Sequence, residues 1–386
     1  MPARWRGLIG DRGASLLIVT AIMIALLSVA ALAVDVGLLV TARTEAQRVA
    51  DMAAHAGASA LISAPGDASV ARATAIDFAA RNTIRGLPAV VRPGDVDVLL
   101  GERKVRVRVY RTAARSSPVA TFFARVFGVD DADITAVAAA KIVPAGEVNC
   151  LLPVAVADRW YEASSGERAS QNDTWDPDGG DEYRDGAYAY GPDDIGTLIT
   201  LKPSQGAAGG AARNRGVGQC DGEACTESHR FTAGWWYLWY PTGERGARTL
   251  REQILACPDP QPAYQGGEWV TDKNGNVQSI QKAFEELIER DPGAYWDDSC
   301  SCVRGSKYGV SPRVRAVPVF NPETYSKQGP DSNFQISGFI GVFIVPGPPG
   351  LPLGQQSTYA RIMSVQGELG GGNSAGPLVW AVQIVE

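Results

Sequence analysis

Residues 14–34 read ASLLIVTAIMIALLSVAALAV, a run of 21 residues without a charged side chain. A helix rises about 1.5 Å per residue, so this run would cover roughly 32 Å, enough to cross a hydrocarbon core of about 30 Å. The apolar pattern continues beyond Asp35 through residues 36–40. We therefore predict a transmembrane anchor over residues 14–40. Asp35 is expected at its far edge, and we favour a charge that the headgroup region tolerates over the alternative, a specific contact within the membrane.

Three arginines, Arg4, Arg6 and Arg12, precede the anchor. Arginine before a span favours a cytoplasmic N-terminus, so residues 1–13 are expected inside and the rest of the chain outside. The alternative is a cleaved signal peptide with Ala31-Leu32-Ala33 as its cleavage site, which would release a secreted adhesin. A signal peptide usually has an apolar core of about 7–15 residues. The longer run therefore favours a retained, single-pass anchor.

Ordered motifs around the anchor resemble a known family. The apolar run closes on Ala33-Val34-Asp35-Val36-Gly37, an Ala-rich stretch TARTEAQRVADMAAHAGA follows at 41–58, and residues 118–128 read PVATFFARVFG. This order resembles the TadE- and TadG-like proteins of the Tad (Flp) pilus-assembly system, TadG-like proteins in particular. The resemblance implies a bacterial inner-membrane protein that serves pilus assembly or anchoring. Its implied partners are other Tad membrane proteins or pilins and the lipid bilayer.

The fold expected from the pattern is α+β. Residues 41–146 are predicted to form a pilin-like stalk domain in which the anchor helix runs on and packs on a small antiparallel sheet. The strict alternation of Val105-Arg106-Val107-Arg108-Val109 is typical of a half-buried strand. The elements expected in this domain are helices at 41–62, 67–84 and 118–127 and strands at 96–100, 104–111 and 132–143.

A change of composition at Pro144-Ala145-Gly146 predicts a domain boundary near residue 147. Residues 147–386 alternate short aromatic or β-branched runs with Gly and Pro turns, which indicates a β-rich extracytoplasmic domain. One amphipathic helix is expected at 278–290, ended by Asp291-Pro292-Gly293. The expected strands are 151–157, 197–202, 231–240, 313–320, 334–345, 358–366 and 376–385.

All six cysteines of the chain belong to this second domain, and outside the cytoplasm they are expected to form disulfides. A bridge between Cys220 and Cys225 would close a small loop. Cys300 and Cys302 stand one residue apart, and we expect each to pair elsewhere. Fifteen pairings remain open among six cysteines. The candidates are Cys150, Cys220, Cys225, Cys257, Cys300 and Cys302.

No catalytic set is expected in this chain. The Gly372–Gly376 stretch has the G-x-S-x-G pattern around Ser374, but neither Asp nor His follows it, as a hydrolase of that pattern requires. The D-x-S-x-S string from Asp297 follows a turn, whereas in von Willebrand A domains it ends a buried strand. We therefore predict a non-enzymatic protein without a cofactor. A membrane-tethered hydrolase remains the alternative.

An acidic stretch provides weak candidates for a calcium site, because hard cations take clusters of carboxylates from one loop. A solvated acidic loop is the preferred interpretation, since the order of residues departs from that of an EF-hand. The five candidates are Asp173, Asp176, Asp178, Asp181 and Asp185. Over the whole chain, 42 acidic against 36 basic residues give a net charge of −6, which argues against a nucleic-acid partner.

Overall fold

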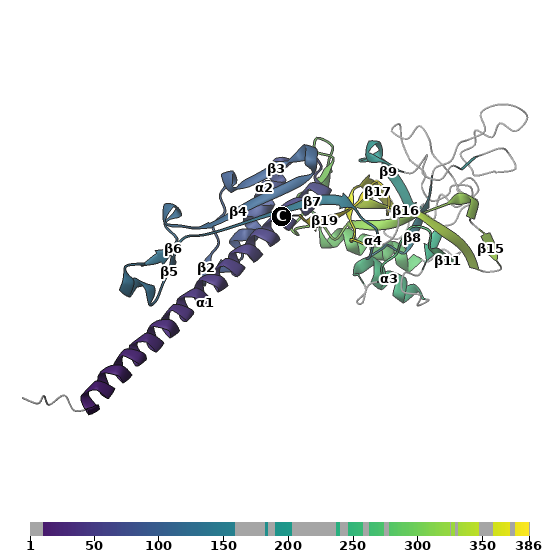
Figure 1. Cartoon of the computed structure of the whole chain (residues 1–386). Coiled ribbons are helices and arrows are strands. Elements are labelled where there is room, and N and C mark those ends of the chain that lie inside the picture. The colour runs from purple at the N-terminus through teal and green to yellow at the C-terminus, as the bar shows by residue number, and fades with distance from the viewer. Residues whose placement is uncertain are drawn as a thin grey trace, which may run out of the picture.

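The structure is a computed structural model (Figure 1). It describes residues 11–158, 182–183, 190–202, 237–239, 246–257, 262–273, 278–324, 326–328, 331–346, 358–370 and 375–385. Its first element is α1 (Asp11–Ser63), a helix of 53 residues that would extend roughly 80 Å. Figure 1 shows the N-terminal half of α1 standing clear of all other elements, while its C-terminal half lies against a sheet.

The C-terminal half of α1 buries a face of small side chains. The members recur at intervals of three and four residues, which places them on one side of the helix. They are Ala42, Ala46, Val49, Ala50, Ala53, Ala54, Ala58, Leu61 and Ile62. Alanine allows the helix axis to approach the sheet closely. The helix predicted for residues 41–62 is thus present, as the continuation of the apolar run.

The sheet that covers this face has five strands in the order β18-β19-β7-β4-β3. Strand β4 (Lys104–Arg111) buries Val105, Val107 and Val109, as its alternating sequence predicts. The strands that flank it are β3 (Val96–Leu99) and β7 (Ile134–Pro144), and α2 (Ala68–Ala80) packs beside α1. The first unit is therefore a long helix on a sheet in which β3, β4 and β7 are antiparallel.

The last strands of the chain return to this sheet. Strand β19 (Val379–Ile384) pairs antiparallel with β7, with Ala381 opposite Val143, and β18 (Val365–Gln366) pairs with β19. Residues from both sides of the boundary predicted near residue 147 thus share one sheet.

Gly57 lies where α1 crosses α2 and β4. A Cβ atom built there would come within 3.0 Å of Val105 Cγ1 and 3.1 Å of the Ala71 carbonyl oxygen. We expect Gly57→Leu to lower the stability of the first unit by about 1–3 kcal/mol, since overpacking forces neighbours apart. Gly37→Leu is the matched control, because nothing lies within 4 Å of the Cβ position in the same helix. Thermal unfolding of both variants in detergent would decide, and equal melting temperatures would contradict the prediction.

The second unit contains a mixed sheet in which β11 pairs with both β10 and β16, so that β11, β10, β8, β14 and β16 close on themselves. Strand β17 pairs with β16 on one side and with β9 on the other, and β15 also pairs with β16. The bounds are β8 (Val154–Ala157), β9 (Leu198–Lys202), β10 (Tyr237–Trp239), β11 (Trp269–Lys273), β14 (Val314–Phe320), β15 (Ser326–Gln328), β16 (Asp331–Val345) and β17 (Thr358–Met363).

Two helices accompany this sheet. Helix α4 (Gln278–Arg290) has the bounds that the sequence predicts, and its residues Ile280, Phe284 and Leu287 are buried. Helix α3 (Ala247–Leu255) was not predicted, although Leu250 and Ile254 recur at helical spacing and are buried. Short two-stranded pairs complete the described fold: β1 (Thr83–Ile84) with β2 (Leu87–Pro88), β5 (Val119–Ala120) with β6 (Asp131–Ala132), and β12 (Tyr295–Asp297) with β13 (Cys302–Arg304).

Disulfides join Cys150 to Cys257 and Cys300 to Cys302. The second pairing corrects the expectation that Cys300 and Cys302 pair elsewhere. Ser301 between them has a left-handed backbone with φ +49°, which reverses the chain and brings the two Cα atoms to 5.2 Å. Cys220 and Cys225 lie outside the described residues.

Candidate functional site

The exposed half of α1 is long and apolar enough, by length and composition, to cross a membrane. Its leucines, isoleucines and valines point outward without a partner in the described part of the chain, as Leu17, Leu27 and Leu32 illustrate. In water such a surface would be strongly unfavourable. Arg12 lies in the first turn of this helix, whereas Arg4 and Arg6 lie outside the described residues.

Asp35 marks the end of the charge-free run and is almost fully buried, with 3% of its surface exposed. Its carboxylate accepts hydrogen bonds from three consecutive backbone N–H groups. The Phe122 amide donates to Oδ1 at 2.8 Å, the Phe123 amide donates to Oδ2 at 2.9 Å, and the Ala124 amide donates to Oδ2 at 2.5 Å. These amides lie at the start of a short 3-10 helix, Ala124–Phe127, so Asp35 caps it from another part of the chain.

Asp35 therefore has a specific structural contact. The sequence favours a tolerated charge over a specific contact, whereas the structure shows the specific contact. The reason is that the motif at 118–128 folds back against α1, across 87 residues of chain. The carboxylate and the three amides are hydrogen-bonded to one another, so neither is left unpaired in this buried position.

The segment that Asp35 holds is a hairpin between β5 and β6. Thr121 closes its neck, because its amide donates to the Asp130 carbonyl at 3.1 Å and its hydroxyl donates to the Val129 carbonyl at 2.5 Å. Gly128 ends the 3-10 helix in the left-handed region with φ +82°. A helix was expected at 118–127. The structure has instead a strand followed by this one helical turn.

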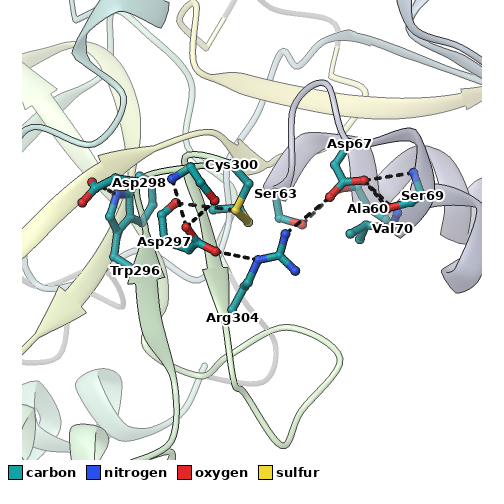
Figure 2. The surroundings of a disulfide bond; sticks show 12 residues. Ala60, Ser63, Asp67, Ser69, Val70, Trp296, Asp297, Asp298, Cys300 and Arg304 are labelled. Atoms are coloured by element: carbon teal, nitrogen blue, oxygen red, sulfur yellow. Dashed lines mark hydrogen bonds and ion pairs between the residues drawn. A yellow bond between two sulfur atoms is a disulfide. The ribbon is translucent and has the colours of Figure 1, made fainter.

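A second candidate site is the junction between the two units (Figure 2). Arg304, in β13, lies between Asp297 and Asp67, with its Nε 2.9 Å from Asp297 Oδ2 and its Nη2 3.6 Å from Asp67 Oδ2. Asp67 belongs to the first unit, where it caps α2 by accepting from the amides of Ser69 and Val70. One guanidinium thus connects the start of α2 with the disulfide-closed hairpin of the second unit.

Local hydrogen bonds keep both carboxylates ionised. The Ser69 side chain, the Val70 amide and the Arg304 charge lower the pKa of Asp67. The Ser299 hydroxyl and amide, with Arg304, lower the pKa of Asp297. Beside this bridge, an apolar groove of about 860 Å³ has Met52, His55 and Arg304 among its lining residues. Water reaches the ion pair from the groove, so its contribution to stability should stay below about 1 kcal/mol.

Two buried charged residues, Asp291 and Arg313, flank the hairpin that carries Arg304. Asp291 accepts hydrogen bonds from the hydroxyls of Ser306 at 2.7 Å and Ser311 at 2.6 Å. Arg313 is 1% exposed and donates to the carbonyls of Ile344, Asp291 and Ala294. These bonds fix the loop after α4 against β14 and β16.

Among the described residues, the remaining sequence candidates do not come together in one site. Asp297, the carboxylate of the D-x-S-x-S string, accepts hydrogen bonds from the amide and hydroxyl of Ser299 and forms an ion pair with Arg304. Ser374 and the five calcium candidates, Asp173, Asp176, Asp178, Asp181 and Asp185, lie outside the described residues. Within the described residues, no three His, Cys, Asp or Glu side chains cluster closely enough to hold a metal ion.

Comparison with known proteins agrees with the resemblance seen in the sequence. Residues 13–60 match the Tad family model, described as Flp pilus-assembly TadE/G-like. The match therefore covers the exposed half of α1, Asp35 and most of the face that packs on the sheet. Comparisons with curated proteins and with solved structures give no match.

Proposed function

We propose that this chain is a non-enzymatic, single-pass component of a Tad (Flp) pilus-assembly system. It is anchored in the bacterial inner membrane by residues 14–40, with residues 1–13 in the cytoplasm and the two β-containing units outside. Other Tad membrane proteins or pilins are its proposed partners. The observation that carries the proposal is the continuity of α1, which joins an exposed apolar segment to a face packed on the sheet, and the TadE/G-like match spans both.

Two further features support this orientation. Arg4, Arg6 and Arg12 all precede the apolar run, as expected for a cytoplasmic N-terminus. The disulfides Cys150–Cys257 and Cys300–Cys302 suit an oxidising compartment outside the cytoplasm.

A non-enzymatic role is consistent with a chain that has only two histidines, His55 and His229. Serine-reactive probe labelling at Ser374 would overturn this part of the proposal.

Reporter fusions test the topology. Alkaline phosphatase, which is active only outside the cytoplasm, should give signal when fused after residue 60 and after residue 386. A fluorescent protein that matures only in the cytoplasm should stay dark at both places. Replacing Arg4, Arg6 and Arg12 together by Glu should weaken this bias, because basic residues before the span set its orientation. A cytoplasmic signal from the unaltered chain would refute the proposed topology.

A further inference from the structure

The tip of the β5–β6 hairpin is an exposed apolar surface. Phe122 is 69% exposed, Val126 80% and Phe127 77%, and Phe123 and Val129 are also exposed. The rings of Phe122 and Phe123 pack edge to face, with their centroids 5.2 Å apart. Large apolar side chains gathered on one short loop indicate a surface that another apolar phase covers.

The contact with Asp35 fixes the height of this tip along α1. The amides of residues 122–124 bond to Asp35 directly, so the backbone of the tip lies level with the end of the charge-free run. From Ala14 to Asp35 the helix rises about 32 Å, close to the thickness of a hydrocarbon core of about 30 Å. Figure 1 shows β5 and β6 beside α1, at the end of the first unit nearest the free half of the helix.

The charges of the hairpin suit the same location. Arg125 is exposed between Phe123 and Val126, where its guanidinium can meet lipid phosphates. The acidic residues Asp130 and Asp131 follow the tip, at the neck of the hairpin. The tip therefore combines aromatic and aliphatic side chains with one cation, the composition of segments that lie in the membrane interface.

We infer that the β5–β6 hairpin inserts its tip into the outer leaflet of the bilayer that α1 crosses, as a second membrane contact. Asp35 holds the hairpin against the helix and supplies the acceptors that its backbone needs beside lipid. Two contacts at one level restrict the tilt of α1 and the orientation of the sheet above the membrane. The inference rests on the proposed membrane span of α1.

Depth-dependent fluorescence quenching tests this contact in the full chain. Single cysteines replace Val126 in the tip, Leu27 in the span or Val310 in the second unit, all exposed positions. Each is labelled with an environment-sensitive maleimide dye, and the protein is reconstituted in phosphatidylethanolamine–phosphatidylglycerol vesicles with spin-labelled lipid. The parent chain gives the background, since no cysteine among the described residues is free. We expect quenching at 126 to exceed that at 310 by at least about twofold, with the shallow lipid label most effective.

The position in the span separates this inference from the proposed function. Quenching at 27 with none at 126 would overturn the hairpin contact and leave the anchor intact. Absence of quenching at 27 would refute the membrane span itself. A dye at 126 that is shielded in cells but not quenched in vesicles would show a protein partner on the tip, and would also overturn the inference.

Discussion

Replacing Arg313 by methionine should lower the stability of the second unit by about 3–5 kcal/mol, because it removes a buried guanidinium that bonds three backbone carbonyls and whose charge favours the ionised form of the buried Asp291 carboxylate. Methionine reproduces the aliphatic part of the arginine side chain but leaves the carbonyls of Asp291, Ala294 and Ile344 without their donor. It also removes the guanidinium that lies 4.4 Å from the centre of the Phe343 ring. A unit of this size should lose roughly 10 °C of melting temperature.

Two variants make this measurement specific. Arg304→Met removes a half-exposed arginine of the neighbouring hairpin, so it should shift the melting temperature by only a few degrees. Arg313→Lys keeps the charge but has a single nitrogen for three carbonyls, so it should recover only part of the loss. If Arg313→Met and Arg304→Met had the same melting temperature, the buried Arg313 guanidinium would not be what supports this region.

The buried Asp291 carboxylate gives a pH dependence with a definite sign. Burial raises the pKa of Asp291, but hydrogen bonds from Ser311, Ser306 and the Lys307 amide, together with the charge of Arg313, outweigh it and bring the pKa below its ordinary value. A carboxyl whose pKa is lowered on folding contributes stability above its unfolded pKa of about 3.9. That contribution is lost as the pH falls through the folded value, so the second unit should weaken in acid.

Local patterns of sequence predicted the elements whose side chains repeat regularly. The valines and arginines of β4 alternate with a period of two residues, which fits a strand and not a helix. The apolar residues of α4 repeat with a period of 3.6 residues, which fits a helix and not a strand. Helix α3 shows the limit of this approach. Its nine residues carry the spacing of Leu250 and Ile254, but a helix of this length is hard to distinguish from a loop without its packing partner, α4.

Contacts between distant segments could not be predicted from local sequence patterns. The hydrogen bond from the Phe122 amide to Asp35 joins residues 87 apart. The sequence pattern of one segment gives no sign that it will contact the other. The return of β19 to β7 likewise depends on the path of the whole second unit. The Cys300–Cys302 bridge depends on the left-handed backbone of Ser301. A serine in the sequence does not predict that conformation, which is uncommon for residues other than glycine.

Asp35→Ala should free the hairpin from α1. The substitution leaves the amides of residues 122–124 without an acceptor, and we expect the local opening of the hairpin to become easier by about 3–4 kcal/mol, because hydrogen bonds to charged groups are the stronger kind. At 1.4 kcal/mol per factor of ten, this corresponds to roughly 100- to 1,000-fold less protection of these amides from hydrogen exchange. Hydrogen-exchange mass spectrometry of the detergent-solubilised full chain, followed in peptides that cover residues 119–130, measures the effect.

Two further variants distinguish loss of the contact from loss of a negative charge. Asp35→Asn keeps one acceptor oxygen but points an NH₂ group at the N–H donors, so its protection should fall between the parent and Asp35→Ala. Asp131→Ala removes an exposed carboxylate from the same hairpin and should leave exchange at 122–124 unchanged. Peptides from β4 and β7 should keep their protection in every variant, because their hydrogen bonds lie within the sheet. If Asp35→Ala exchanged like the parent at 122–124, the carboxylate would not be what attaches the hairpin to the anchor helix.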